Sequence, residues 1–404
     1  MAGLQRRAIK YSMEAIKSFY FLYYAAAASL VPFLIIYYEQ LGFSGRQIGF
    51  LAAIPPLVIL LSAPLWGAAA DATKQHKRLL MFAIAGALVV VFFFSKTIAF
   101  AWIIPVVVVY AFFAAPIMPL VDASTMDWLG EGRNLYGRIR LWGAIGWGVS
   151  APLIGWLIER SSVGWAFYGY IILMLGGLAV AWFLPIRETS AQQPFWSGLR
   201  LITGNRQWLL FLAVVFIGGM CLAIVSNFLF LYMNGLGASK TLMGLALTFA
   251  TLSELPILFY SNRLLNRWGA RGLLMVALAA YVVRALAYTF ISEPWMFLVV
   301  QFLHGLSFSA MWVAGVSYAD SMAPEGLSAT AQGLFSGVQL GLGGIAGGLI
   351  GGILYDELGA TTMFRWAALA ALVGLMVFAL VSRSAPKKEA TPIPVGGTRD
   401  DTIG

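Results

Sequence analysis

One membrane-length stretch, residues 136–159, carries an arginine among apolar, aromatic and small residues. On a helix, Tyr136, Arg140 and Trp147 share one face, because steps of three and four residues return to the same side. That face offers a hydroxyl group, a fixed cation and a flat ring, and a charge within a membrane span usually faces a partner or a water-filled cavity. The alternative is an arginine at a helix end that extends to the lipid headgroups.

Asp122 lies eighteen residues before Arg140, on the other side of a polar turn at residues 131–134. At 1.5 Å per residue, both side chains lie roughly 9–14 Å inward from that turn, so we expect them to pair between neighbouring helices. A carboxylate beside a guanidinium accepts and donates several hydrogen bonds, which suits a hydroxyl-rich solute. A purely structural ion pair is the alternative.

A second group of ionisable residues lies deep in the later spans. Arg284 and His304 flank one predicted turn and lie roughly 14–17 Å from it, and Glu254 lies at a similar depth. Desolvation raises the pKa of a buried carboxyl group and a nearby arginine lowers it. Such a group can therefore bind and release a proton as its surroundings change. We therefore expect Glu254 to carry a coupling proton. The alternatives are a packing role for His304 and a helix-kink role for Glu254 before Pro256.

The composition excludes an ordinary soluble domain, since 60% of the residues are hydrophobic and 11% are charged. Apolar runs recur from end to end, which predicts an all-α membrane protein. The basic and polar start lacks the features of a cleavable signal peptide. A single cysteine excludes a disulfide framework and Cys-based metal sites. The net charge of +9 lies mainly in loops and tails, which indicates membrane topology and not nucleic-acid binding.

The apolar runs predict twelve transmembrane helices in two pseudo-symmetric halves of six. We expect an N-terminal half at residues 1–190, a cytoplasmic linker at 191–206, a C-terminal half at 207–384 and a disordered cytoplasmic tail at 385–404. The predicted spans are residues 18–38, 47–68, 79–94, 99–121, 138–158, 164–184, 207–232, 241–260, 272–290, 295–318, 328–354 and 363–381.

The basic residues predict the orientation of the chain. With both termini in the cytoplasm, 20 of the 26 Lys and Arg residues lie on the cytoplasmic side and 5 on the other. By the positive-inside rule, this distribution predicts a multi-pass protein of the plasma (inner) membrane with both termini cytoplasmic.

A weak internal repeat supports the two halves. The loop at residues 67–78 and the stretch at 262–271 combine acidic or amide residues with basic ones at matched positions, as in transporters with internal repeats. The pattern resembles the cytoplasmic loop signature of the major facilitator superfamily, with Lys74 in place of the third glycine. The resemblance implies a gate loop that stabilises one closed state; a simple topology determinant is the alternative. The predicted gate residues are Gly67, Asp71, Lys77, Arg78 and Arg267.

The stretch at residues 136–147 resembles the fifth helix of the lactose permease and its sugar–proton symporter relatives, through its Gly, Arg and Trp positions. The spacing of Asp122 and Arg140 matches that family's substrate-binding carboxylate and arginine. Arg284 and His304, twenty residues apart, match the arginine and histidine of its coupling site. The resemblance implies the major facilitator fold, proton coupling and a sugar stacked on Trp147.

Several positions depart from that pattern. Ser307 stands where the family has a carboxylate three residues after the histidine, and Glu254 lies about one turn out of register. Asn227 and the 339–340 region replace an Asp–Lys pair. Proton coupling is therefore expected to be rearranged around Glu254, and the permease's own substrate does not carry over. Broader relatives that share the fifth helix and an eighth-helix Glu-x-Pro resemble phenylpropionate and nucleoside carriers as well as sugar carriers.

Together these features predict a proton-coupled symporter that imports a small organic solute, a sugar or sugar-like compound, by alternating access. The alternatives are a carrier of aromatic carboxylates, with Arg140 on the acid and Tyr20, Tyr23 and Tyr24 lining the pocket, a nucleoside carrier, or a drug exporter. The predicted substrate-binding residues are Asp122, Arg140, Trp147, Tyr24 and Asn227, and the predicted coupling residues are Glu254, Arg284 and His304.

An enzyme is not expected, because no metal set or nucleophile–base motif is present. A signalling receptor would need a soluble domain to pass the signal on. We expect no cofactor other than the coupling proton, and no nucleic-acid partner. The expected partners are the substrate, protons and the lipid bilayer, and the protein is expected to act as a monomer.

Overall fold

The computed structural model describes residues 2–130, 135–186, 206–324 and 327–382, and every regular element in these ranges is a helix. The predicted linker at 191–206, apart from Arg206, and the predicted tail at 385–404 lie outside the described residues. The first group of helices comprises α1 (Ala2–Gln40), α2 (Gly45–Thr73), α3 (His76–Phe94), α4 (Phe100–Ala114), α5 (Ile117–Leu129), α6 (Tyr136–Arg160) and α7 (Gly164–Ala181).

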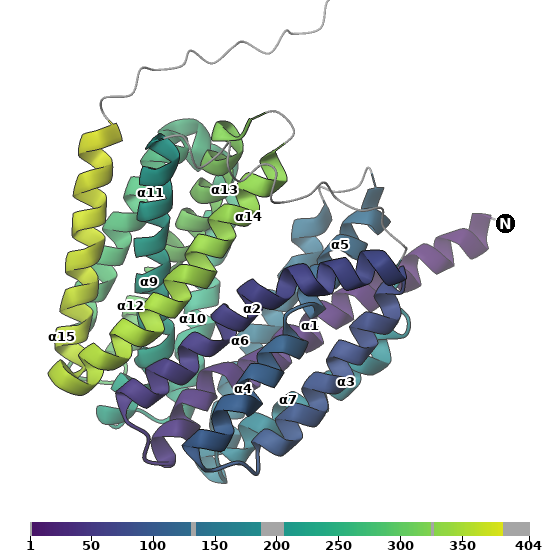
Figure 1. Cartoon of the computed structure of the whole chain (residues 1–404), viewed down its shortest axis with the longest axis horizontal. Helices are drawn as coiled ribbons and strands as arrows, with labels where there is room; N and C mark the ends of the chain where they lie inside the picture. Colours follow the sequence, from purple (N-terminus) through teal and green to yellow (C-terminus); the bar gives the residue numbers. More distant parts are fainter. Residues whose placement is uncertain (1, 131–134, 187–205, 325–326, 383–404) are drawn as a thin grey trace, which may run out of the picture.

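The second group lies beside the first in Figure 1. It comprises α9 (Arg206–Gly235), α10 (Lys240–Phe259), α11 (Ser261–Tyr288), α12 (Met296–Gln301), the π-helix η2 (Gly305–Ser309), α13 (Ala310–Met322), α14 (Ser328–Ser336), the π-helix η3 (Gly337–Leu342) and α15 (Gly343–Ser382).

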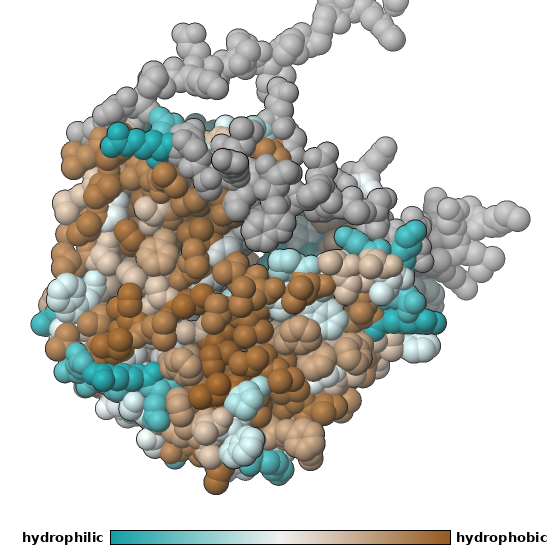
Figure 2. Space-filling model, in the orientation of Figure 1, coloured by the Kyte–Doolittle hydropathy of each residue, from teal (hydrophilic) through white to brown (hydrophobic). Residues whose placement is uncertain are grey.

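The described chain crosses the membrane twelve times, as predicted. Eleven helical stretches are long and apolar enough to span a bilayer, and the last of them, Thr330–Val381, contains 52 residues. This stretch turns back at Gly359, whose φ of 74° interrupts the helix, so it supplies two spans (Figure 1). Apolar side chains cover the flank of the molecule and hydrophilic ones gather towards the ends of the helices (Figure 2).

Matched corners in the two groups support the predicted pseudo-symmetry. Gly42 before α2 and Gly237 before α10 have φ values of 78° and 77°. Two residues later, the side chains of Ser44 and Ser239 accept hydrogen bonds from backbone N–H groups in the first turns of α2 and α10. A glycine tolerates positive φ and a serine N-cap stabilises the first turn of a helix. This combination begins a helix at the same place in both groups.

The two stretches identified as an internal repeat both contain a residue with positive φ. Lys74 and Gly269 occupy the same position of the repeat, and their φ values are 53° and 65°. Lys74 therefore adopts the left-handed conformation that glycine favours, which accounts for the glycine expected there. The second copy was wrongly predicted to be a loop, since α11 already begins at Ser261 and its first part continues to Gly269.

Other helix limits also differ from the prediction. The first helix begins at Ala2 instead of residue 18, because its polar start is itself helical, with a Glu14–Lys17 ion pair at 3.0 Å one turn apart. The fourth span is broken at Pro116 into α4 and α5 and continues to Leu129. The tenth and eleventh spans each contain a π-helical segment, and such segments are frequent at functional sites.

The two groups touch through α2 and α15, α6 and α10, and α1 and α9. At one end the backbones almost meet: a Cβ on Gly49 would lie 2.3 Å from the carbonyl oxygen of Gly348, and one on Gly155 would lie 2.2 Å from that of Lys240. Small residues allow this approach, as in other membrane helix interfaces. The end of α1, the beginning of α2 and the end of α9 are nearest this contact. All three belong to the side predicted to be exterior.

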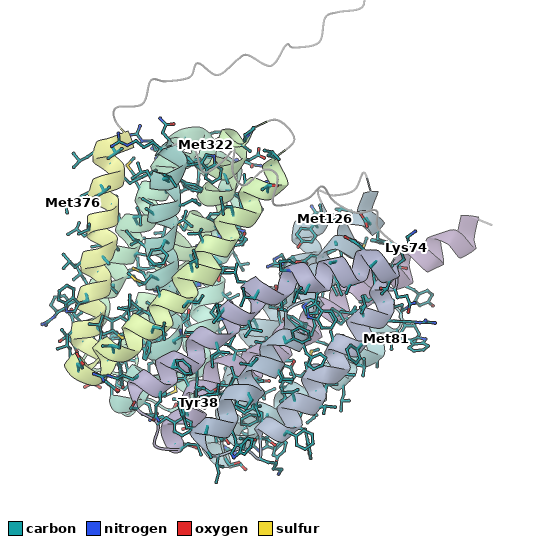
Figure 3. The ribbon with its side chains drawn as sticks, in the orientation of Figure 1. Tyr38, Lys74, Met81, Met126, Met322 and Met376 are labelled. Carbon is teal, nitrogen blue, oxygen red and sulfur yellow. The ribbon has the colours of Figure 1, made fainter. Side chains whose placement is uncertain are left out.

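The opposite end is open. A Cβ on Gly67 of α2 or on Gly137 of α6 would meet nothing within 4 Å, although the same helices are crowded at their other ends. Figure 3 shows Met126 and Met322 at the separated ends of the two groups and Tyr38 at the joined end. The structure therefore opens towards the side that the basic residues predict to be cytoplasmic.

Polar contacts reinforce the closed end. Asp356 accepts hydrogen bonds from the backbone N–H groups of Gly45 and Arg46, the latter at 2.9 Å, so a residue of the second group caps the first turn of α2. A carboxylate at a helix N-terminus is favoured both by the unpaired N–H groups and by the helix dipole. Arg46 also forms an ion pair with Glu357. We call Asp356 and Glu357, with α2's first turn, the exterior latch.

Removing the Asp356 carboxylate is expected to open the closed end more often. Hydrogen bonds to a charged acceptor contribute about 1.5–3 kcal/mol, so Asp356→Ala should raise the ratio of open to closed molecules by roughly ten- to a hundredfold. A cysteine at Ser226, inside the molecule, reports this opening through its labelling by a membrane-impermeant maleimide added from outside; Cys221 is buried and gives a low background. Glu293→Ala, at an exposed acidic residue of the same end, is the matched control. Equal labelling rates in both variants would contradict the latch.

Candidate functional site

The first polar cluster surrounds Asp122. Nη1 of Arg140 lies 3.5 Å from Oδ2 of Asp122, and the hydroxyl group of Tyr20 donates to Oδ1. Nη1 of Arg140 also lies 3.4 Å from the hydroxyl oxygen of Tyr136, one helical turn earlier, and its guanidinium carbon lies 5.7 Å from the ring centroid of Tyr24. The structure thus brings together side chains from α1, α5 and α6.

Small residues on α6 bring α1 this close. A Cβ on Gly143 would lie 2.4 Å from the ring of Tyr24, and one on Gly146 would lie 2.3 Å from the carbonyl oxygen of Phe21. Glycine at these two positions therefore lets the aromatic face of α1 pack on α6 beside Arg140.

The pair at the centre of this cluster remains accessible. The side chain of Arg140 is 47% exposed and that of Asp122 is 31% exposed, although Tyr20 beside them is fully buried. Side chains of α1 and α5 cover one part of the guanidinium, and the rest of its surface is exposed. A guanidinium has five N–H donors, and its contacts with Asp122 and Tyr136 leave donors free for a solute.

The second polar cluster surrounds Arg284, which is 2% exposed. Its Nε donates to Tyr288 at 3.1 Å and its Nη2 donates to Oε1 of Gln301 at 2.6 Å. Its Nη1 contacts Nδ1 of His304 at 2.9 Å and the hydroxyl group of Ser307 at 3.2 Å. The buried cation is thus held by neutral hydrogen-bonding groups, which is required of a charge at membrane depth.

His304 connects Arg284 to Glu254. A guanidinium can only donate, so Nδ1 of His304 accepts from Arg284 and the proton of a neutral imidazole resides on Nε2. Nε2 lies 3.2 Å from Oε1 of Glu254. The hydroxyl group of Ser309 donates to the other carboxylate oxygen at 3.2 Å. Arg284, His304, Glu254 and Ser309 therefore form one continuous chain across α11, the tenth span and α10.

The π-helix η2 shapes this chain. Its first residue, Gly305, lies against α10 so closely that a Cβ would be 2.0 Å from the carbonyl oxygen of Ser253. The backbone N–H of Gly305 donates to the hydroxyl group of Ser253 at 2.9 Å, and that hydroxyl also donates to the backbone of Ala250. This contact fixes α10, and Glu254 with it, against His304.

The remaining predicted residues lie elsewhere. Trp147 is half-buried on α6, two turns beyond Arg140, and is not in either polar cluster. Asp71, Arg78 and Arg267 are exposed at the open end. Lys77 donates to the backbone carbonyls of Trp182 and Leu184, so it caps the end of α7 within its own helix group.

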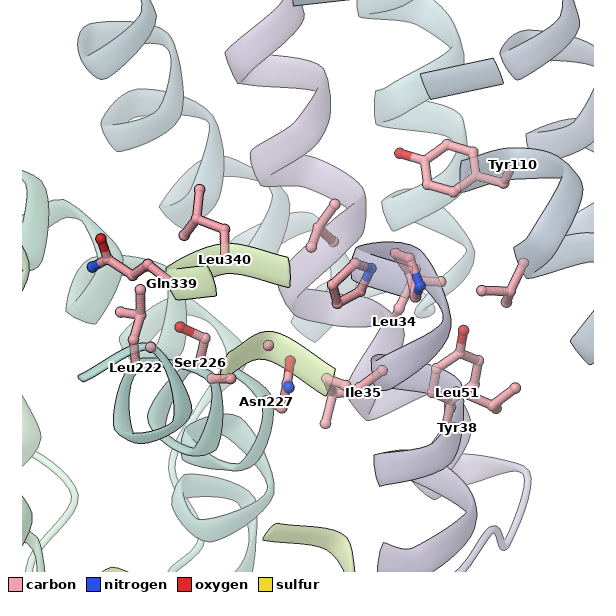
Figure 4. Close-up of a pocket in the computed structure, with 18 of the residues that line it drawn as sticks. Leu34, Ile35, Tyr38, Leu51, Tyr110, Leu222, Ser226, Asn227, Gln339 and Leu340 are labelled. Atoms are coloured by element: carbon pink, nitrogen blue, oxygen red, sulfur yellow. The ribbon is translucent and has the colours of Figure 1, made fainter. Parts of the chain in front are cut away.

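Asn227 lies in a cavity of about 290 Å³ (Figure 4). The cavity is bounded by α1, α2 and α4 on one side and by α9 and η3 on the other, and most of its lining is apolar. Along α1, its lining residues Val31 to Tyr38 lie between Tyr24, which is beside Arg140, and the end of the helix at Gln40. Gln339, which the sequence placed near Asn227, also lines it.

Three residues that accept hydrogen bonds from Arg284 were not predicted as its partners from the sequence. Tyr288 lies one turn after Arg284, and Gln301 and Ser307 lie one turn before and after His304. This spacing places each of them on the same helix face as its charged neighbour, so a search for polar residues at steps of three and four would have found them. Among the described residues, no group of three His, Cys, Asp or Glu side chains is arranged to hold a metal ion.

The model of the "MFS_1 like family" matches residues 13–366. The maltose permease of Geobacillus stearothermophilus is 29% identical over 367 residues, which cover 90% of this chain and 93% of that protein. The "Probable 3-phenylpropionic acid transporter" of Escherichia coli (strain K12) is 27% identical over 356 residues, covering 84% and 90%. The crystal structure of the nucleoside transporter NupG superposes with a TM-score of 0.80 at 17% identity, covering 92% and 99%.

The close contact at Gly305 yields a test of the second cluster. Gly305→Ala places a methyl group on the Ser253 carbonyl, so α10 must shift and the Glu254–His304 contact lengthens. We expect unfolding to become easier by about 1–3 kcal/mol, as for other overpacked sites, with a lower Tm in a thermal melt. Gly235→Ala is the matched control, because a Cβ there meets nothing within 4 Å. An unchanged Tm for Gly305→Ala would show that the contact does not constrain α10.

Proposed function

Because this chain belongs to the MFS_1 like family, and is a multi-pass membrane transporter and not an enzyme, we propose that it is a proton-coupled symporter for a sugar or sugar-like compound. The observation that carries the substrate class is the accessible Asp122–Arg140 pair with its tyrosine neighbours. The coverage of the maltose permease along nearly its whole length supports the same class.

A sugar fits this pair on chemical grounds. Each sugar hydroxyl group both donates and accepts, and the pair offers a carboxylate that only accepts next to a guanidinium that only donates. Two adjacent hydroxyl groups can therefore be held at once, one by each partner, with the ring of Tyr24 beside them. Since the pair is partly exposed, a solute that enters from the open end can reach it.

The chain through Glu254 supports coupling to protons. An ionised Glu254 accepts from both His304 and Ser309, one on each oxygen. Protonation places an O–H on one of those oxygens and removes the negative charge that strengthens both contacts. The Ser309 hydroxyl can turn to accept that O–H, but the hold of α10 on the tenth span weakens, so the two can separate or rotate. Because α10 packs on α6, which carries Arg140, this movement would reach the substrate site.

An aromatic carboxylate is the second candidate substrate. Arg140 can form a bidentate pair with a carboxylate, and the rings of Tyr24 and Tyr136 lie beside it. The similarity to the 3-phenylpropionic acid transporter gives this class independent support. Nucleosides and drug export are further alternatives, and the fold shared with NupG is compatible with the former.

Proton movement in liposomes tests the proposal. The purified protein is reconstituted with a pH dye inside, and maltose, uridine and phenylpropionate are added in turn; we expect internal acidification with maltose as protons enter with the sugar. Glu254→Gln should abolish the acidification but leave maltose exchange intact, whereas Glu293→Gln, at an exposed site, should change neither. Acidification that survives Glu254→Gln would place the proton elsewhere, and acidification with phenylpropionate alone would select the second candidate.

The guanidinium of Arg140 gives a separate prediction. Arg140→Lys keeps the positive charge but loses the planar fork, so it cannot hold Asp122 and a solute oxygen together. We expect at least a tenfold loss of maltose affinity, measured by exchange in liposomes. Arg365→Lys, at an exposed position on α15, should retain wild-type affinity. Equal affinity in wild type and Arg140→Lys would contradict a direct role of the guanidinium.

A further inference from the structure

The tenth span departs from a regular helix between Gln301 and Ala310. α12 ends at Gln301, and the backbone N–H groups of Phe302 and Leu303 donate to carbonyl groups three residues earlier, at 3.2 and 3.0 Å. The π-helix η2 follows, and the N–H group of Ala310 donates to the carbonyl group of Gly305, five residues earlier. A tightly wound turn is thus followed by a loosely wound one. One identifiable cause of such a break is a side chain inserted into the hydrogen-bond ladder.

The inserted side chain is Ser253 of α10. In a regular α-helix, the N–H group of Gly305 would donate to the carbonyl oxygen of Gln301, four residues earlier. Instead it donates to the hydroxyl oxygen of Ser253 at 2.9 Å, and that hydroxyl group also lies 3.3 Å from the carbonyl oxygen of Gln301. One hydroxyl group of α10 therefore separates a donor and an acceptor that would otherwise bond to each other.

The glycine at position 305 makes the insertion possible. A Cβ there would lie 2.0 Å from the carbonyl oxygen of Ser253 and 3.0 Å from the backbone nitrogen of Glu254. The backbone of the tenth span thus lies directly on the backbone of α10, at the residue before Glu254. A change in this contact therefore reaches Glu254 through one peptide bond.

The π-helix determines which side chains reach Glu254. His304 and Ser309 contact its two carboxylate oxygens at 3.2 Å each, and they are five residues apart. In an α-helix, a step of five residues ends about 140° away from the starting face, since each residue turns about 100°. In a π-helix, five residues complete roughly one turn, because this is the spacing of its hydrogen bonds. The two partners of Glu254 therefore share one face because the segment between them is π-helical.

Other charged and titratable groups near Glu254 belong to α11. Nη1 of Arg284 donates to Nδ1 of His304 at 2.9 Å, and Tyr281 lies within electrostatic range of Glu254. On its other side, α10 meets α6 through uncharged groups, such as the hydroxyl of Thr248 on the α6 backbone. A proton on Glu254 therefore acts first on the two side chains at the ends of η2.

We propose that Ser253 is a positioning residue for proton coupling, because its inserted hydroxyl group maintains the π-helix that assembles the partners of Glu254. This inference rests on the proposed proton coupling and identifies the element that responds to the proton. When Glu254 is protonated, the contacts of its carboxylate weaken and α10 moves away, taking Ser253 with it. The segment then becomes α-helical, and Ser309 turns away from Glu254.

Hydrogen bonding along the backbone permits this conversion. With Ser253 inserted, its hydroxyl group contacts both Gly305 and Gln301. With Ser253 withdrawn, the N–H group of Gly305 bonds to the carbonyl group of Gln301, and the Ser253 hydroxyl keeps its bond to the carbonyl of Ala250, which is 2.6 Å long here. Neither form leaves these buried backbone groups unpaired.

Removal of the hydroxyl group tests this role. In liposomes with an internal pH dye, Ser253→Ala should lower the acidification per maltose transported roughly tenfold, as expected for a lost hydrogen bond to a charged acceptor, while maltose exchange continues at the wild-type rate. Thr251→Val, which removes a hydroxyl group bonded to Leu247 of the same helix at 3.0 Å, is the matched control and should change neither. Ser253→Thr keeps the hydroxyl group and should keep the acidification.

A structure of the Ser253→Ala variant in the same open state is the second measurement. We expect the N–H group of Gly305 to bond to the carbonyl group of Gln301, and residues 302–310 to form a regular α-helix. Ser253→Cys, whose sulfur atom accepts hydrogen bonds only weakly, takes its place in both measurements should Ser253→Ala not fold.

The possible results separate this role from the proposed function. Lost coupling with exchange retained, and a regular helix in the variant, support the role of Ser253. Wild-type acidification in Ser253→Ala, or a π-helix that persists there, overturns it while proton symport stands. Loss of exchange together with acidification assigns Ser253 a purely structural role and also overturns it. If the folded wild type shows no acidification with maltose, uridine or phenylpropionate, the proposed coupling fails and this inference fails with it.

Discussion

An arginine within the membrane must find hydrogen-bond acceptors there, because its positive charge is costly in an apolar medium. Arg284 and Arg140 meet this constraint in opposite ways. Arg284 is almost completely buried, and its donors are used by Tyr288, Gln301, Ser307 and His304. Arg140 has one carboxylate, one phenol and open space around it. The second helix group therefore holds a cation that its hydrogen bonds keep in place while a neighbouring group gains or loses a proton. The first helix group holds a cation with donors left for a solute.

Much of this arrangement was predictable from the sequence, because depth in a membrane follows from counting residues. Glu254, Arg284 and His304 were expected at one level, and they are in contact. The π-helical segment at Gly305 was not predicted, since it arises from tertiary packing of the tenth span on α10 and leaves no local pattern. The closed end could not be predicted either. The two states of such a molecule use the same helices, and their small difference in free energy depends on contacts between distant segments.

The contacts between the helix groups divide into two kinds. Glycine-lined crossings at Gly49 and Gly155 bring the backbones of two helices close together. The exterior latch, the Asn234–Glu39 hydrogen bond at 2.8 Å and the Glu159–Thr241 contacts are polar and lie at the edge of the membrane. Midway along α6, the hydroxyl group of Thr248 donates to the carbonyl of Gly148 at 2.6 Å. This arrangement suits a rocking motion, since the midpoint stays joined while either end separates.

The capping of α2 by Asp356 has a consequence for the speed of the transport cycle. The groups that separate on opening are the N–H groups of a first helical turn and a carboxylate, and all lie where water enters as they part. Water can replace each lost hydrogen bond at once, so no unpaired polar group persists along the way. The activation barrier to opening then arises mainly from unpacking the glycine crossing below. We therefore expect van der Waals contact in that crossing to limit the rate of opening, and the latch to set the ratio of the two states.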